Sequence, residues 1–358
     1  MEKNARTVIQ NHTRRATQWV VLGANMIGDT MDKTALITGI SGQDGSYLAE
    51  LLLDLNYTVV GMVRRLSHPN IINIEHIKDE VTLEEGDLTD QSSINTIVRK
   101  HHPDEVYNIA SQSFVGASWK QPVLTSDVTG LGALRVFEAV RMESPESKIY
   151  QAGSSEMFGK VTESTQTEHT QFHPRSPYGA AKALAHYLAV NYRESYNMFI
   201  SNGILFNHES ERRGIEFVTK KIAVAAARIA AGIQKTPLEL GNIDTKRDWG
   251  YAPEYVEAMW CMMQEEHPGD YVIATGEAHS IKEFVIEAFK VAGIDLSNDE
   301  AQWSRSGYVK CNTIGNVRPA DVNLLCGDAS KARRELGWVP KIKFKKLVKI
   351  MVEHEMRT

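Results

Sequence analysis

The chain has 358 residues, of which 42% are hydrophobic and 24% charged, enough to bury one substantial core or one core plus a smaller lobe. Its formal net charge is −5, charges of both signs are mixed along it, and no long basic block suggests a nucleic acid partner. The three cysteines (Cys261, Cys311 and Cys326) are too few and too widely spaced for a disulfide framework or a zinc site, so we expect a reducing, cytoplasmic setting and no metal.

The first 30 residues differ in composition from the rest. Arg14 and Arg15 precede a short apolar patch at Trp19–Leu22, which is too short for the core of a signal peptide. We interpret residues 1–30 as a disordered extension. An organelle-targeting leader stays open as the alternative, because this stretch is poor in acidic residues. No apolar run in the sequence approaches the roughly 20 residues that span a bilayer, so no membrane partner is expected.

From residue 33 onward, short apolar runs alternate with helical periodicity. Strands are predicted at residues 34–38, 58–63, 105–109 and 148–151, and a helix at 46–56 carries four leucines on one face. This alternation predicts an α/β fold with a doubly wound, Rossmann-like parallel sheet and a smaller C-terminal α/β substrate lobe. We expect the sheet domain at 31–206 and the substrate lobe mainly at 207–358, with 242–280 returning in part to the sheet. Ser280 and Glu283 form a capping box that opens a helix through Val291.

A glycine-rich segment, T-G-I-S-G-Q-D-G, follows the first strand and opens the first helix. In this context, glycines allow a tight turn, a close approach of backbone N–H groups to a pyrophosphate, and close packing of the helix. The helix N-terminus adds a partial positive charge. A glycine-rich turn without a ligand is the alternative. The cofactor contacts expected in this segment are Gly39, Gly42, Gln43, Asp44 and Gly45.

The end of the second strand indicates which cofactor binds. An acidic residue there would accept a bond from the ribose 2′-hydroxyl of NAD, but this chain has Arg64 and Arg65. Guanidinium groups suit the 2′-phosphate of NADP, so we predict NADP; a solvated surface pair is the alternative. Asp87 and Leu88 follow the next strand and are expected to contact the adenine, although Asp87 could equally be a turn residue.

Two further segments carry candidate catalytic groups. Tyr178 and Lys182 form Y-x-x-x-K, which places both side chains on one face of a helix, where a nearby ammonium would lower the tyrosine pKa. Ser154 and Glu156 follow a predicted strand and, if that segment is extended, point to the same side. A solvated Tyr–Lys pair and a loop-capping Glu156 are the alternatives.

Together these motifs resemble the GDP-mannose 4,6-dehydratases of the extended short-chain dehydrogenase/reductase superfamily, from about Met31 to the C-terminus. Superfamily membership is indicated by the glycine segment and Y-x-x-x-K. The dehydratases are singled out by S-S-E-M-F-G at 154–159, F-N-H-E-S at 206–210 and R-D-W-G-Y-A at 247–252, followed by R-P-A at 318–320. Glu211 departs from the pattern, since many relatives carry proline there.

The resemblance implies a role for each matching residue. Tyr178 would take the proton of the sugar 4-hydroxyl, Ser154 would hydrogen-bond that hydroxyl, Lys182 would hold the ribose, and Glu156 would remove the carbon 5 proton. The substrate, GDP-mannose, would be contacted by Asn207, Lys221, Arg247 and Arg318. Each of these could instead be a structural or surface group.

The product implied is GDP-4-dehydro-6-deoxy-D-mannose, a precursor of GDP-fucose, formed without net consumption of NADP. Relatives assemble as homodimers or homotetramers, and we expect the same here. Two other functions stay open. One is a 4-keto sugar-nucleotide reductase or epimerase on the same fold, and the other is an inactive NADP-binding regulator.

Overall fold

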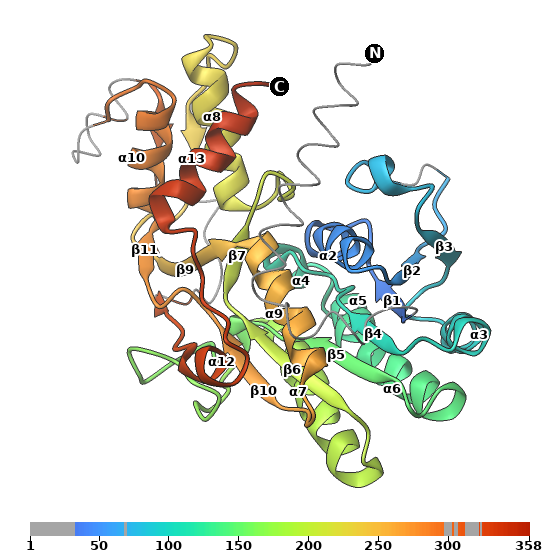
Figure 1. The fold of residues 1–358 in the computed structure, drawn as a ribbon. Helices are drawn as coiled ribbons and strands as arrows, with labels where there is room; N and C mark the ends of the chain where they lie inside the picture. Colours follow the sequence, from blue (N-terminus) through green and yellow to red (C-terminus); the bar gives the residue numbers. More distant parts are fainter. Residues whose placement is uncertain (1–32, 68–69, 297–302, 304–306, 312–321, 323) are drawn as a thin grey trace.

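The computed structural model describes residues 33–67, 70–296, 303, 307–311, 322 and 324–358. Short, mostly buried runs form the central sheet, with the largely exposed strand Thr82–Glu85 at one edge. Every neighbouring pair of strands in this sheet is parallel (Figure 1). The seven strands lie in the order β10-β6-β5-β4-β1-β2-β3. They are β1 (Thr34–Thr38), β2 (Thr58–Val63), β3 (Thr82–Glu85), β4 (Glu105–Asn108), β5 (Lys148–Ala152), β6 (Ile200–Leu205) and β10 (Asp270–Ile273).

Helices cover both faces of this sheet, because alternate residues of each buried strand point to opposite sides. Ile37 of β1 packs with α2 (Gln43–Asp54) and α9 (Ala252–Gln264), which lie side by side in Figure 1. Leu36 packs with the helices on the other face, which are α3 (Gln91–His101), α6 (Gly132–Glu143) and α7 (Pro177–Tyr196). The predicted doubly wound α/β fold class is therefore confirmed.

Shorter helical segments connect these elements. They are η1 (Glu75–Ile77), α4 (Val115–Ser118), α5 (Pro122–Ser126), the π-helical turn η2 (Asp127–Leu131), η3 (Ser155–Met157) and α12 (Ser330–Glu335).

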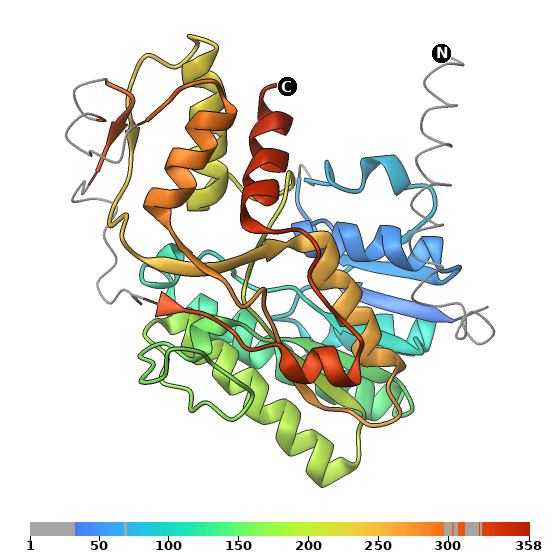
Figure 2. The ribbon, with the colours of Figure 1, turned by 60° about the vertical axis from the view of Figure 1, so that its left-hand side comes forward.

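A smaller lobe is built from later segments and has its own core. Its strands are β7 (Asn207–Glu209), β9 (Lys246–Tyr251), β11 (Ala278–Ser280) and β13 (Leu324–Leu325), with β8 (Leu238–Glu239) paired separately to β12 (Val309–Lys310). Its helices α8 (Val218–Ala230), α10 (Ile281–Val291) and α13 (Phe344–Glu355) stand together in both ribbon views (Figures 1 and 2). Trp249, Phe284 and Phe344 lie in the core between them.

Local signals set several boundaries. The capping box of Ser280 and Glu283 is present, and α10 ends at Val291 as predicted. The predicted first and second strands coincide with β1 and β2. The predicted extension at 1–30 lies outside the described residues. Among the helices of the described chain, none is long and apolar enough to cross a membrane. The described part also contains no group of three or more histidine, cysteine or acidic residues placed to hold a metal.

Candidate active site

The glycine loop (residues 38–45) is folded too tightly for larger residues. Gly39 has a φ of +74°, in the left-handed region that favours glycine. A Cβ atom at Gly45 would lie 2.3 Å from the carbonyl oxygen of Gly39. The loop thereby brings the start of α2 against the end of β1. In the described structure, Gly42 caps α2 without a side-chain hydrogen bond, so the first N–H groups of the helix suit an anion.

Side chains at the start of α2 bind a strand of the smaller lobe. The Asp44 carboxylate lies 2.9 Å from Nε2 of His208. Gln43 donates to Asp44 at 2.9 Å and to the carbonyl of His208 at 3.2 Å, and it accepts from Ser210 at 2.8 Å. His208 was not singled out from the sequence, although it lies within the F-N-H-E-S motif. Its place in that motif could have indicated a functional role, but its partner, Asp44, is remote in sequence.

Three further predicted cofactor residues follow β2 and β3. Arg64 is exposed directly after β2. The Asp87 carboxylate accepts hydrogen bonds from the backbone and the hydroxyl of Thr89, both at 2.8 Å, so it makes the contacts of a turn residue. Leu88 is buried, and its carbonyl accepts from Arg135 at 2.9 Å.

The predicted extended arrangement of Ser154 and Glu156 is wrong. Ser154 is extended, but it caps the 3-10 helix η3, and its hydroxyl accepts a hydrogen bond from the backbone of Glu156 at 3.2 Å. A serine that caps a helical turn satisfies an N–H that a strand would leave to a neighbour. Glu156 is therefore presented from a helical turn, and its side chain is buried.

Helix α7 places Tyr178 against that turn. Ser176 caps the helix by accepting from the backbone of Gly179 at 3.0 Å, and Pro177 occupies its first position. A Cβ atom at Gly179 would lie 2.6 Å from the carbonyl oxygen of Glu156, so only glycine lets the two elements approach this closely. The Ser154 hydroxyl and the Glu156 carboxylate are consequently both close enough to Tyr178 to change its pKa.

The pKa of Tyr178 is raised in the protein alone, so the expected lowering by Lys182 stays a prediction for the protein with its ligands bound. Burial raises the pKa of Tyr178 to about 12; the Ser154 hydrogen bond lowers this pKa and the Glu156 charge raises it. The Lys182 ammonium instead donates to the Ala152 carbonyl at 2.7 Å and lies 5.9 Å from the centre of the tyrosine ring. Burial lowers the pKa of Lys182 to about 8.

The predicted substrate residues lie in the smaller lobe. Asn207 begins β7, and its Oδ1 atom is buried without a hydrogen-bond partner among the described residues. Lys221 of α8 donates to the Glu239 carbonyl at 2.7 Å. Arg247 of β9 is buried and donates to the Val322 carbonyl at 2.6 Å. Arg318 lies outside the described residues.

Arg213 is a second basic group that the sequence interpretation did not assign to the site. Its Nε lies 3.0 Å from the Glu209 carboxylate, and its guanidinium covers the Phe217 ring. Its charge lowers the pKa values of both Tyr178 and His208, which places it near the proposed reaction centre.

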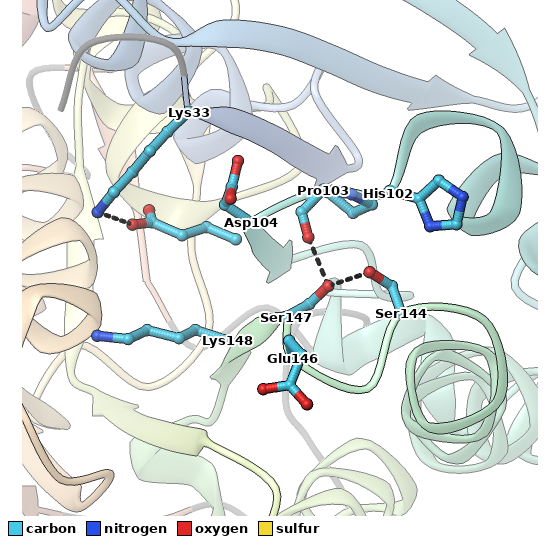
Figure 3. A pocket seen from close by; sticks show the side chains of 9 residues that line it. Lys33, His102, Pro103, Asp104, Ser144, Glu146, Ser147 and Lys148 are labelled. Atoms are coloured by element: carbon cyan, nitrogen blue, oxygen red, sulfur yellow. Dashed lines mark hydrogen bonds and ion pairs between the residues drawn. The ribbon is translucent and has the colours of Figure 1, made fainter.

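A polar pocket at the opposite ends of the strands is a poorer candidate for the active site (Figure 3). It lies at the amino ends of β1, β4 and β5, whereas ligands of doubly wound sheets bind at the carboxyl ends. Its groups already bind one another: Lys33 pairs with Glu105, and Ser147 donates to the Pro103 carbonyl. Lys148 donates to two backbone carbonyls near the end of α9, at 2.8 and 3.0 Å.

Comparison with known proteins identifies relatives over most of the chain. A sequence model of the family described as "GDP-mannose 4,6 dehydratase" matches residues 36–351. GDP-mannose 4,6 dehydratase 1 of Arabidopsis thaliana is 49% identical, over 90% of this chain and 90% of that protein. The GDP-mannose 4,6 dehydratase of Homo sapiens is 46% identical, over 90% of this chain and 91% of that protein.

Solved structures share the fold at lower sequence identity. The dTDP-glucose 4,6-dehydratase of Streptomyces venezuelae, solved with NAD, has a TM-score of 0.78 and 19% identity over 90% of this chain and 96% of that one. RMD of Pseudomonas aeruginosa, solved with NADPH, has a TM-score of 0.74 and 20% identity over 91% of this chain and 99% of that one. At such identities, these similarities establish the fold alone.

Proposed function

Because the chain belongs to the GDP-mannose 4,6-dehydratase family, we propose that it converts GDP-D-mannose to GDP-4-dehydro-6-deoxy-D-mannose with loss of water. The observation that carries this proposal is the buried Glu156 carboxylate beside Ser154 and Tyr178. A reductase or epimerase of this fold has no need of such a carboxylate, whereas dehydration needs a base for the carbon 5 proton.

In the proposed reaction, the chain's own groups move the protons. Tyr178 accepts the proton of the 4-hydroxyl. Ser154 forms a hydrogen bond with the same hydroxyl. The ketone at carbon 4 acidifies carbon 5, and Glu156 takes that proton. Hydroxide leaves carbon 6. Of the two protons that Tyr178 and Glu156 accepted, one joins this hydroxide to give the released water, and the other returns to carbon 5.

The glycine loop fits a nicotinamide dinucleotide. The glycines have no side chains that would keep a pyrophosphate away from the loop backbone, and no Cβ atom would fit at Gly45. Helix α2 begins there with N–H groups available to an anion. Proteins of similar fold were solved with NAD and NADPH, which supports a nicotinamide cofactor. When bound, this group would supply the acceptor for the carbon 4 hydride and the donor of that hydride to carbon 6. Gly39, Gly42 and Gly45 would hold its pyrophosphate, and Lys182 its ribose.

The cofactor is proposed to be NADP because Arg64 is exposed where NAD-binding relatives would need an acid. Arg64→Ala should weaken NADP binding by about 1.5 to 3 kcal/mol, the size of a hydrogen bond to a charged group. NAD, which lacks the 2′-phosphate, should bind almost as before. Titration calorimetry with both cofactors checks this. Equal losses for NAD and NADP would contradict the assignment of Arg64 to the 2′-phosphate.

The substrate is proposed to bind across the smaller lobe. The Oδ1 of Asn207 is buried with no hydrogen-bond partner in the part of the chain that the structure describes, so it offers an acceptor for a sugar hydroxyl or for an N–H group. Lys221, Arg247 and Arg318 supply positive charge for the diphosphate. Lys221 and Arg247 also bind backbone carbonyls within the lobe, so substrate contacts would be added to existing structural ones.

One incubation separates this function from its rivals. The protein is mixed with GDP-mannose and a catalytic amount of NADP, and the products are analysed by mass spectrometry while the absorbance of reduced nicotinamide is followed. A dehydratase yields many equivalents of product lighter by one water, with no net change in absorbance. A reductase can only run backwards here, so it forms NADPH in proportion to product and stops when the NADP is used up. An epimerase yields no mass change, and an inactive regulator yields no product.

The chain is also proposed to form a homo-oligomer. Apolar side chains are exposed on neighbouring segments of one helical face, namely Val123 and Leu124 of α5, Leu131 of η2, and Leu184 and Tyr187 of α7. Val123 is 80% exposed and Tyr187 59%, which is costly unless a second copy covers them.

Sedimentation equilibrium should therefore give a dimer or tetramer, and an aspartate at Leu184 should reduce the mass to that of a monomer. Ile233→Asp, at a 71% exposed position in the smaller lobe, is the matched control and should leave the mass unchanged. A monomeric parent protein would disprove the assembly.

A further inference from the structure

The start of the smaller lobe is bonded side chain by side chain to the first turns of the cofactor helix. Segment 208–212 makes these contacts with α2: His208 to Asp44 at 2.9 Å, Ser210 to Gln43 at 2.8 Å, Glu211 to Tyr47 at 3.2 Å, and Arg212 to Ser46 at 3.0 Å. The first of these joins a carboxylate to an imidazole, and its Asp44 belongs to the glycine loop.

Hydrogen bonding fixes the protonation of His208. Its Nδ1 lies 2.8 Å from the carbonyl oxygen of Phe206, and its Nε2 lies 2.9 Å from the carboxylate of Asp44. A carbonyl and a carboxylate can only accept, so both ring nitrogens must donate, and the ring is an imidazolium. In agreement, the charge of Asp44 and its hydrogen bond raise the pKa of His208 against the effect of burial. The pKa of Asp44 falls to about 2, against burial, because of His208.

Asp44 creates an electrostatic problem at this place. It is the second residue of α2, where a carboxylate stabilises the helix dipole but competes with any other anion for the same N–H groups. A pyrophosphate bound to the glycine loop would meet that negative charge in a poorly solvated site. The imidazolium of His208, held directly against Asp44, reduces the net charge of the pair to zero.

We propose that His208 is a positioning residue that cancels the charge of Asp44 and so allows the start of α2 to accept the cofactor's pyrophosphate. This inference rests on the proposed binding of NADP at the glycine loop. It assigns the cofactor helix a charge partner in the other lobe. Stacking on Tyr255, with ring centres 4.7 Å apart, keeps the imidazolium in place, and Gly250 leaves room for that tyrosine.

The changes in NADP affinity among four proteins test this assignment. The dissociation constant is measured by calorimetry for the parent, His208→Gln, Asp44→Asn and the double variant. Glutamine can still donate to Asp44, so charge is the main change. We expect His208→Gln to bind NADP at least tenfold more weakly. Asp44→Asn and the double variant keep the backbone N–H of residue 44 and leave no uncompensated carboxylate, so they should bind NADP within about threefold of the parent or more tightly.

Other patterns overturn the inference. If His208→Gln and the double variant are equally weak, His208 acts on the ligand itself and not through Asp44. If both single variants are weak, the pair is only a structural link. Unchanged affinity throughout removes any role for the charge. Thermal unfolding of each variant confirms that it folds. A folded parent that binds no NADP would refute the proposed function instead.

The pH dependence supplies a readout that a purely structural link would not change. The charged groups facing His208 are Asp44 from α2 and Arg213 from the following loop, with the neutral Tyr255 stacked on it. As the pH is raised from neutral into the alkaline range, the parent should lose NADP affinity as His208 loses its proton, and Asp44→Asn should lose less. Lys182 also titrates in this range, and the charge of Asp44 raises its pKa, so the parent is also compared with His208→Gln, which keeps Asp44 and lacks the imidazole. Identical profiles would contradict the proposal.

Discussion

Replacing Tyr178 with phenylalanine is expected to lower turnover by about 10³-fold, within the range for removing a positioned acid or base. The variant keeps the ring, which packs at the start of α7, and loses only the hydroxyl that reaches Ser154. Without it, the 4-hydroxyl proton has no acceptor, so even the first oxidation stops. Steady-state assays with GDP-mannose measure the loss, and the dissociation constant of GDP-mannose should change little.

The same helix provides the control for this prediction. Tyr187→Phe removes a hydroxyl from a tyrosine that is 59% exposed two and a half turns further along α7, and turnover should stay at the parent level. If Tyr178→Phe keeps more than a tenth of the parent turnover, another group accepts the proton and the proposed role of Tyr178 fails.

Replacing Glu156 with glutamine should reduce overall turnover by about 100-fold or more, because the carbon 5 base is lost while size and hydrogen bonding are kept. Oxidation at carbon 4 does not need this carboxylate. A 4-keto hexose that retains its 6-hydroxyl should therefore accumulate in the variant, up to about one per active site. Rapid quenching and mass spectrometry detect it, and it should be absent from Tyr178→Phe.

Solvent exchange then tests Glu156 directly. In heavy water, the parent should place deuterium at carbon 5, and Glu156→Gln should do so at least 100-fold more slowly. Glu163→Gln, in an exposed loop beyond η3, is the matched carboxylate control and should exchange as the parent does. Exchange at the parent rate in Glu156→Gln would show that another group removes the proton.

Much of the sheet is predictable because its signals are local. Buried parallel strands need continuous apolar runs, and this fixes β1 and β2 to the residue. The start of α10 follows from the reciprocal bonds of Ser280 and Glu283. Ser154 illustrates the limit. A hydroxyl after a strand can continue the extended chain or cap a turn, and here the cap with Glu156 prevails.

The chemistry of the site is less predictable, because the charges and pKa shifts of its residues depend on contacts remote in sequence. Spacing alone placed Lys182 near Tyr178, and its ammonium does lie 5.9 Å from the ring centre, but spacing did not show that the ammonium donates to the Ala152 carbonyl at the end of β5. The Asp44–His208 pair joins residues 164 positions apart, and no local pattern connects them. Motif membership can therefore identify His208 as a candidate, but only the tertiary structure gives it a partner and a charge.

The position of β10 at the edge of the sheet has a consequence for synthesis on the ribosome. β6 is buried at every residue, yet its outer neighbour, β10, is made only after β7, α8, β9 and α9. Until then, the nascent sheet ends in an apolar edge with unpaired backbone groups, and α2 lacks the α9 partner beside it. The part of the chain that contains the central sheet therefore cannot finish folding before much of the smaller lobe has emerged from the ribosome. A chain cut near residue 206 would expose that edge to other nascent chains, so the two lobes depend on being translated as one.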